Sequence, residues 1–299
     1  MPLTLQSPAK INLSLEILDK RPDGYHNLDS LFLPISLFDT LTFEESPELS
    51  LRISPESTIP IHEIGTDADN LILRAAKILQ TRHAPLAGAK ITLTKHIPIG
   101  GGLGGGSSNC ATTFHALNRL WDLGLPRTTL EAYAAELGSD TPAFVRGGAV
   151  RMTGRGEILK PAFPDCPENR ESIPPLWVVL INCGEHCSTK EVYKHYIKEL
   201  TPRPDFYYTV AHFALSGAVS QLAENLFNSL QKGVYARYPR VETSARLLKE
   251  AGAEGVLLSG SGATVFGLVR DQAHGQTVCG RLPTEMWKAV ARAIYCPMV

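Results

Sequence analysis

The sequence predicts an α+β protein of two domains, and three observations support this. Patterns typical of strands and of helices are mixed in both halves, and 299 residues with 43% hydrophobic content are enough for two cores. Between Lys160 and Pro175 the chain is rich in proline, aspartate, glutamate and asparagine, which continue neither regular structure. This interruption predicts a first domain at residues 1–163 and a second at 164–299.

The first half opens with a predicted strand over residues 10–18. Apolar and polar residues alternate there, which places Lys10 and Asn12 side by side on the polar face. Residues 31–35, 39–43 and 49–53 predict three further strands, and residues 90–94 predict a half-buried one.

Three helices are predicted between and after these strands. Asp69 or Asn70 caps the first helix. The second ends at Gly124 and Pro126, and its apolar stripe consists of Cys110, Phe114, Leu117 and Trp121. Thr128 and Glu131 have the spacing of a capping box that opens the third helix, and Gly138 ends it.

The sequence of the second half also predicts both strands and helices. Residues 176–181 form an apolar strand, and Ser188 with Glu191 caps a helix. Further helices are expected around Ala211, Leu226 and Leu247, followed by a pair of strands that flank residues 260–262.

The most informative segment runs from Pro98 to Ser108, PIGGGLGGGSS, between the strand at 90–94 and the second helix. Glycine lets the backbone approach a ligand closely, and the free amides at a helix start favour an anion. The segment therefore predicts a phosphate-binding loop.

Three kinds of phosphate loop fit the order of strand, loop and helix. A Walker loop needs a lysine after its last glycine, but Ser107 follows Gly106. A dinucleotide-binding pattern is present at Gly100, Gly102 and Gly105, yet a nearly continuous glycine run satisfies it by chance, and no ribose-binding acid follows a second strand. A kinase loop of another type is the third interpretation.

The glycine run resembles the ATP loop of the GHMP kinases, named for their galactose, homoserine, mevalonate and phosphomevalonate members. Residues 258–266, LSGSGATVF, resemble the third motif of the family. Residues 7–13, SPAKINL, and 21–26, RPDGYH, resemble the first motif of the branch that acts on 4-diphosphocytidyl-2-C-methyl-D-erythritol. The motifs follow the family's order, and RPDGYH selects the branch.

This resemblance implies a fold and an activity. The fold has a ribosomal-protein-S5-like first domain, a ferredoxin-like second domain and an active site in the cleft between them. The activity is ATP-dependent phosphorylation of the 2-hydroxyl of that compound, in the non-mevalonate pathway to isoprenoid precursors, with Mg²⁺ as cofactor. The partners are then ATP and a diphosphocytidyl sugar alcohol, bound by a monomer or a homodimer.

Asp140, in the segment LGSDTPAF, is the candidate catalytic residue. Taken alone, an aspartate two positions before a proline is typical of a turn or cap, and a single lysine is typically solvated. The resemblance matches Asp140 to the family's catalytic aspartate. Phosphoryl transfer needs little beyond positioning and charge stabilisation, so we expect Asp140 to accept the hydroxyl proton and Lys10 to keep Asp140 ionised and steer the hydroxyl.

The resemblance also implies the binding residues. Tyr25 and His26 match the pair that grips the cytosine, Tyr193 matches the second aromatic and also suits a core position, and Asn12 contacts the substrate near Lys10. Asn70 and Lys95 match positions near the adenosine, and Ser107 and Ser108 also suit the N-cap of a helix. The remaining ATP positions are Pro98, Gly100, Gly101, Gly102, Leu103, Gly104, Gly105 and Gly106, and the third motif contributes Gly260, Ser261 and Gly262. Metal ligands are left unassigned.

Composition narrows the class of protein. A net charge of −1 with scattered basic residues gives no reason to expect nucleic acid, and no run reaches the length of a membrane span. The chain shows no secretion or import leader, so we expect a bacterial cytoplasmic protein. Cys183, His186 and Cys187 cluster but lack a fourth ligand for a tetrahedral metal site, and the Cys110 thiol, expected near ATP, is a candidate for oxidation.

Other functions stay open at this point. Homoserine kinase shares the loop and the fold but is disfavoured by RPDGYH. A non-catalytic nucleotide-binding module on the same fold and, third, a dinucleotide-dependent dehydrogenase are the alternatives from other classes.

Overall fold

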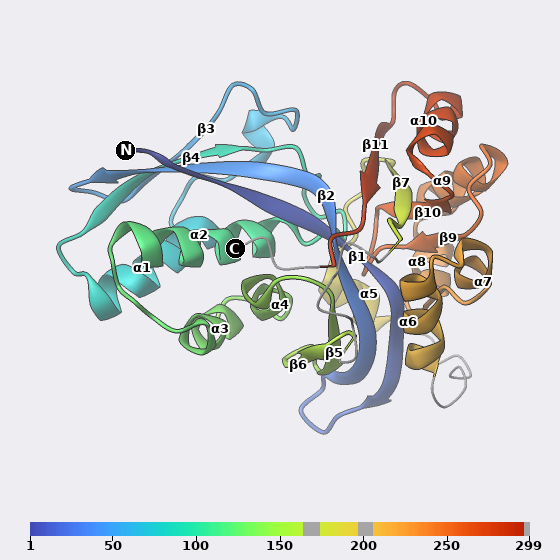
Figure 1. The fold of residues 1–299 in the computed structure, drawn as a ribbon, viewed down its shortest axis with the longest axis horizontal. Helices are drawn as coiled ribbons and strands as arrows, with labels where there is room; N and C mark the ends of the chain where they lie inside the picture. The colour runs from blue at the N-terminus through green and yellow to red at the C-terminus, as the bar shows by residue number, and fades with distance from the viewer. Residues whose placement is uncertain (164–173, 197–205, 296–299) are drawn as a thin grey trace.

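The computed structural model describes residues 1–163, 174–196 and 206–295, and two β-sheets organise them (Figure 1). The first sheet has the strand order β3-β4-β2-β1-β8, and a β5–β6 hairpin is attached to β2. Its long members are β1 (Leu3–Lys20) and β2 (His26–Ser46). The others are β3 (Ser50–Ile53), β4 (Gly88–Thr94), β5 (Val150–Gly154), β6 (Ile158–Pro161) and β8 (Phe227–Asn228).

Helices cover one face of the first sheet. They are α1 (Leu71–His83), α2 (Gly105–Leu120), α3 (Arg127–Ala135) and α4 (Thr141–Arg146), and a short 3₁₀ turn, Ile61–Glu63, precedes them. Phe43 and Ile91 of the sheet pack with Ala75 and Phe114 of the helices in one buried cluster. The apolar stripe of α2 therefore faces this core, as its spacing predicts.

The second sheet has the antiparallel order β11-β7-β10-β9, and both of its faces are buried. Along β7, Val178 and Leu180 contact a cluster that includes Ile11 of β1, whereas Val179 and Ile181 face the outer helices. The strands are β7 (Trp177–Asn182), β9 (Val256–Leu258), β10 (Val265–Val269) and β11 (Trp287–Arg292). The helices are α5 (Thr189–Lys194), α6 (Phe206–Ser216), α7 (Val219–Glu224), α8 (Gln231–Arg237), α9 (Pro239–Glu250) and α10 (Gln272–Arg281).

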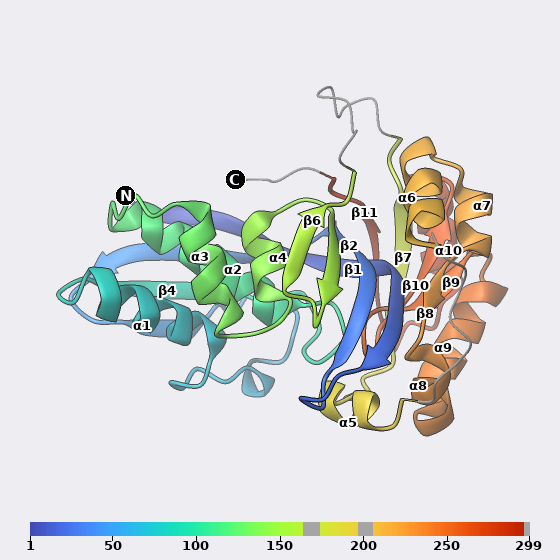
Figure 2. The ribbon, with the colours of Figure 1, turned by 90° about the horizontal axis from the view of Figure 1, so that it is seen from below.

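β1 and β2 connect the two halves, because these strands of the first sheet bend and continue as one ribbon beside the second half of the chain (Figure 2). β1 pairs with β8 at Ser14 and Phe227, and Ile35 of β2 forms a bridge with Ala293. Most of the predicted boundary at 160–175 lies outside the described residues, so the division into 1–163 and 164–299 stays a prediction.

Most predicted elements are confirmed, and three details are wrong. Residues 31–35 and 39–43 belong to one strand, in which a register irregularity leaves only Ser36 and Leu37 without a partner in β1. Thr128 lies inside α3, which starts after Pro126, so Thr128 and Glu131 form no capping box. Leu226 lies between α7 and β8 rather than in a helix.

The starts of helices α1 and α5 differ in their capping bonds. Asn70 caps α1 by accepting a hydrogen bond from the Ile72 amide, whereas Ser188 precedes α5 without such a bond. Within the described ranges, no helix combines the length and the apolar character needed to cross a membrane.

Candidate active site

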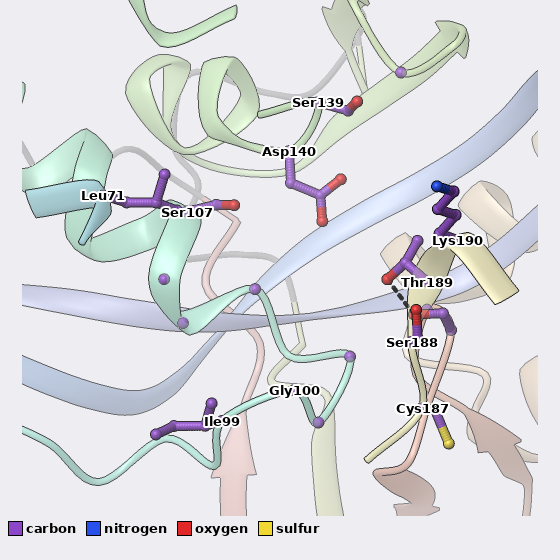
Figure 3. A pocket seen from close by; sticks show the side chains of 18 of the residues that line it. Leu71, Ile99, Gly100, Ser107, Ser139, Asp140, Cys187, Ser188, Thr189 and Lys190 are labelled. Atoms are coloured by element: carbon purple, nitrogen blue, oxygen red, sulfur yellow. Dashed lines mark hydrogen bonds between the residues drawn. The ribbon is translucent and has the colours of Figure 1, made fainter. Parts of the chain in front are cut away.

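A cavity of about 1640 Å³ lies where the two halves meet. It is lined by β1, the β1–β2 turn, the glycine loop and the start of α4 from the first half, and by residues 186–196, 260 and 261 from the second. Figure 3 shows the Asp140 carboxylate pointing into open space between the start of α2 and the segment Cys187–Lys190. The site therefore needs both halves of the chain.

Lys10 and Asp140 meet in this cavity. The Lys10 Nζ lies 3.7 Å from the Asp140 Oδ2, and their side chains are 5% and 37% exposed. Burial lowers the pKa of Lys10, and the Asp140 carboxylate opposes that shift. Asp140 is the N-cap residue of α4, but its side chain makes no capping bond, so the carboxylate is available to a ligand.

A buried hydrogen-bond chain fixes Lys10 from the other side. Lys10 Nζ donates to Asn12 Oδ1 at 2.7 Å, Asn12 Nδ2 donates to Ser30 Oγ at 2.8 Å, and Ser30 Oγ donates to the Ser14 carbonyl at 2.7 Å. A register shift of β1 between Asn12 and Ser14 accompanies this arrangement, as is common for strands beside active sites. The predicted neighbours Lys10 and Asn12 are thus brought together.

The glycine loop has the open backbone that its sequence predicts. Gly102 and Gly104 have φ angles of 73° and 68°, a region that favours glycine. α2 begins at Gly105, and the amides of its first turn are directed to the cavity end of the helix, where they favour an anion.

The third motif packs directly against this loop. A Cβ atom on Gly102 would lie 2.1 Å from the Ser259 carbonyl oxygen, so no side chain fits. The Ser259 hydroxyl donates to the Gly102 carbonyl, and the Thr264 amide donates to the Gly101 carbonyl. The two glycine-rich segments therefore support each other's conformation.

Most, but not all, predicted loop residues line the cavity. Those that do are Pro98, Gly100, Gly101, Gly102, Gly104, Gly105, Gly106 and Ser107, with Gly260 and Ser261 of the third motif. Leu103 is buried in a core cluster, Ser108 accepts a hydrogen bond from Ser7 Oγ inside the protein, and Gly262 does not reach the cavity. Leu103 and Ser108 therefore contribute to the shape of the glycine loop, and Gly262 to that of the third motif, rather than to the cavity surface.

Asn70 and Lys95 both line the cavity while making internal contacts. Asn70 caps α1. Lys95 is 4% exposed and donates to Asp39 Oδ2 at 2.6 Å. Burial lowers the pKa of Lys95 and Asp39 opposes the shift, so Lys95 lines the cavity as one member of a buried ion pair.

The opposite end of the cavity is aromatic. His26 contacts two tyrosines, with its ring centroid 5.8 Å from that of Tyr193 and 5.9 Å from that of Tyr196. Tyr25 is 57% exposed, and the Arg155 guanidinium lies over its ring at 4.8 Å. Figure 2 shows α5, which carries Tyr193, beside the β1–β2 turn.

Protonation at this end is set mainly by burial. Burial, with the charge of Lys20, holds the pKa of the His26 imidazole below its ordinary value. Burial and then the Asp140 charge raise the pKa of the Tyr193 hydroxyl. The lowered pKa favours the neutral imidazole, which has one donor nitrogen and one acceptor nitrogen.

Sequence reasoning missed several residues of this end. Tyr196, Arg155, Lys190 and Lys194 all line the cavity. Tyr196 follows Tyr193 by three residues, a spacing that places both on one side of a turn, so this signal was present. Nothing in the sequence indicates Arg155, because β5 and β6 fold it back over Tyr25.

The cysteines behave differently from expectation. Cys110 is fully buried, and burial raises the pKa of its thiol to about 12, which disfavours the oxidation expected at this residue. The same cause raises the pKa of the Cys187 thiol to about 12. Across the described part of the chain, no group of three or more histidine, cysteine or acidic side chains has an arrangement that would hold a metal ion.

Comparisons with known proteins agree with this geometry. The family models of the GHMP kinases N terminal domain and of the GHMP kinases C terminal domain match residues 70–148 and 211–289. The chain is 39% identical over 281 residues to a 4-diphosphocytidyl-2-C-methyl-D-erythritol kinase of Geobacillus kaustophilus, covering 93% of this chain and 92% of that protein. A protein of the same name from Deinococcus radiodurans is 37% identical, with coverages of 98% and 93%.

Solved structures give the same picture. A crystal structure of 4-(cytidine 5'-diphospho)-2C-methyl-D-erythritol kinase superimposes with a TM-score of 0.80 at 29% identity, covering 98% of this chain and 99% of that one. A homoserine kinase from Cytophaga hutchinsonii has a TM-score of 0.66 at 18% identity, with coverages of 99% and 95%, which is a likeness of fold alone.

Proposed function

We propose that this chain, a member of the GHMP kinase family, transfers the γ-phosphoryl group of ATP to the 2-hydroxyl of 4-diphosphocytidyl-2-C-methyl-D-erythritol. The products are the 2-phosphate and ADP. The relatives at 35–39% identity that carry this activity in their names cover more than nine tenths of the chain, which supports this acceptor.

The observation that carries the proposal is the contact of Lys10 with Asp140 in a cavity shared by a phosphate loop and an aromatic pocket. Phosphoryl transfer proceeds through a loose transition state, so the protein mainly positions groups and stabilises charge. Asp140 accepts the proton of the acceptor hydroxyl as the bond to phosphorus forms. Lys10 stabilises the charge on Asp140 and on the transferring group.

ATP binds along the glycine loop in this proposal. The amides at the start of α2 and the Ser107 hydroxyl face the triphosphate, whereas Asn70 and Lys95 lie at the side expected to hold the adenosine. The positive end of the helix dipole adds to this attraction.

The acceptor binds at the aromatic end. Tyr25 and Tyr193 offer ring faces for the cytosine, and the neutral His26 offers both a donor and an acceptor to its edge. Asn12 lies beside Lys10, where the reacting hydroxyl would sit. The basic side chains Lys20, Arg155, Lys190 and Lys194 also line the cavity and suit a diphosphate.

The proposed cofactor is Mg²⁺, which usually binds one or two carboxylates together with substrate phosphates. The Ser107 hydroxyl offers a hard oxygen donor on the cavity wall beside the glycine loop, which suits an ion held largely by the phosphates of ATP. Bound there with ATP, the ion would neutralise charge on the phosphate oxygens. We also propose a bacterial cytoplasmic location, since the relatives named above are bacterial proteins.

The test is turnover with a panel of acceptors. Incubation with Mg-ATP and 4-diphosphocytidyl-2-C-methyl-D-erythritol should release ADP and give a product phosphorylated at the 2-hydroxyl. A coupled assay measures the ADP, and phosphorus NMR identifies the product. Homoserine and mevalonate lack a nucleobase that could bind in the aromatic pocket, so neither should be turned over. Preferred turnover of either one would overturn the acceptor assignment, and binding of ATP without turnover of any acceptor would indicate a non-catalytic module.

A further inference from the structure

Asp39 is a fully buried carboxylate that neither the motifs nor the proposed chemistry uses. It lies in β2, directly opposite Ser7 of β1. Its environment places it behind the glycine loop rather than in the cavity. An ionised carboxylate in such a position requires strong compensation, because burial removes its hydration.

Four donors supply that compensation. The His96 and Ile97 amides donate to Oδ1 at 2.7 and 2.9 Å. Lys95 Nζ and Asn109 Nδ2 donate to Oδ2 at 2.6 and 3.0 Å. Each carboxylate oxygen of Asp39 therefore accepts two hydrogen bonds, and the one from Lys95 is charge-assisted.

These donors lie on either side of the glycine loop. His96 and Ile97 directly precede Pro98, where the loop begins, and Asn109 lies in the second turn of α2, just after the loop ends. One carboxylate thus ties the two ends of the loop together. Asn109 also donates to Ser7 Oγ at 3.0 Å, which links the same point to β1.

The fourth donor, Lys95, is held next to the first turn of α2. A Cβ atom on Gly105 would lie 2.9 Å from Lys95 Nζ, so the ammonium sits against the backbone of the first turn of α2. Asp39 accepts a hydrogen bond from one of the three N–H groups of Lys95, and the Lys95 side chain also lines the cavity.

We propose that Asp39 is a positioning residue of the nucleotide site. It closes the glycine loop between residues 97 and 109 in its ATP-binding conformation and directs the Lys95 ammonium toward the bound nucleotide. A glycine-rich loop loses much conformational freedom when it orders around a ligand, so ordering it in advance raises affinity. The inference rests on the proposed function for the identity of the nucleotide as ATP.

The test compares two asparagines of α2 that each make two side-chain hydrogen bonds. Asn109→Ala removes the link from Asp39 to the helix, whereas Asn118→Ala removes two bonds to the Leu125 backbone at the far end of the same helix. We expect Asn109→Ala to raise KM for ATP by about tenfold or more and to leave KM for the acceptor within about twofold. Asn118→Ala should lower the melting temperature and leave both KM values within about twofold.

Asp39→Asn is the second variant, because an amide nitrogen cannot accept the bonds that the carboxylate oxygen accepts. It should weaken ADP binding, measured by calorimetry, more than Asn109→Ala does, and speed amide hydrogen exchange in residues 96–108. If Asp39→Asn does not fold, the Asn109 and Asn118 pair decides the question.

Equal KM values for ATP in the two asparagine variants, or parallel increases of both KM values in Asn109→Ala, would overturn the inference. Failure of the proposed function is distinguishable, since it would show as absent acceptor turnover in the unsubstituted protein while ADP binding still reports on the loop.

Discussion

Lys10 illustrates how one residue acquires a role from its surroundings. Its ammonium is nearly buried and has two described partners, the Asn12 amide oxygen and the Asp140 carboxylate. Because Ser30 donates its own proton to the Ser14 carbonyl, its oxygen can only accept from Asn12. The chain from Ser14 to Lys10 therefore allows a single orientation of the Asn12 amide.

Ser30→Ala should reduce kcat by about tenfold with little change in KM, because the loss leaves the Asn12 N–H unpaired and frees the amide next to Lys10. Ser14→Ala is the matched control, since the Ser14 hydroxyl only accepts from the Leu31 amide and does not touch Asn12. Steady-state kinetics and thermal unfolding measure both variants. Equal kcat values for the two would contradict the role given to Ser30.

The sequence predicts the residues of the site that lie in motifs, but not the partners that set their geometry. Lys10, Asn12, Tyr25, His26 and Asp140 line one cavity as expected, because each lies in or beside a recognisable motif. The partners that set their geometry, such as Ser30 and Arg155, are ordinary residues brought in by strand pairing. No local pattern marks them, since their role depends on contacts between distant parts of the chain.

At the scale of elements, two glycine-rich segments from different halves form one structure. Gly102 lies so close to the Ser259 carbonyl that the loop and the third motif exclude even a methyl group. A glycine pattern read within one segment predicts backbone freedom but not this contact. The pattern is thus explained by packing as well as by phosphate binding.

Gly102→Ala should destabilise the protein by at least about 2 kcal/mol, because the methyl group meets backbone atoms and φ is positive. Gly280→Ala, in α10 with open space around the site, should stabilise it by up to about 1 kcal/mol through helix propensity. Denaturant unfolding checks both values. A Gly102 variant as stable as the Gly280 variant would show that the two segments are not tightly packed.

Element boundaries were predictable where local chemistry determines them. Asn70 caps α1, and the alternation in β1 buries Ile11 and Leu13 in a core cluster while Lys10 and Asn12 line the cavity, because a cap and a period of two are local signals. The sequence predicts two strands in place of β2, because the irregular segment around Ser36 and Leu37 resembles a break between strands. Pairing with β1 on both sides of that irregularity keeps the strand continuous.

At the scale of the whole molecule, the site exists only because the halves share a core. Ile11 of β1 packs in one cluster with Val178 and Leu180 of β7, and the same strand carries Lys10 into the cavity. Sequence composition predicts two domains but not a pair of strands that belongs to both. β1 and the turn that follows it therefore bring Lys10, of the proposed catalytic pair, into the same cavity as Tyr25 and His26 of the aromatic pocket.

The most direct test of the central claim is Asp140→Asn. Asparagine keeps the size of the side chain and suits an N-cap, so α4 should form, and Asp271→Asn at the N-cap of α10 is the matched control. We expect Asp140→Asn to lower kcat by at least about 100-fold, while thermal-shift titrations show affinities for ATP and the acceptor within about threefold of the unsubstituted protein. Turnover by Asp140→Asn within about tenfold of that of Asp271→Asn would contradict it.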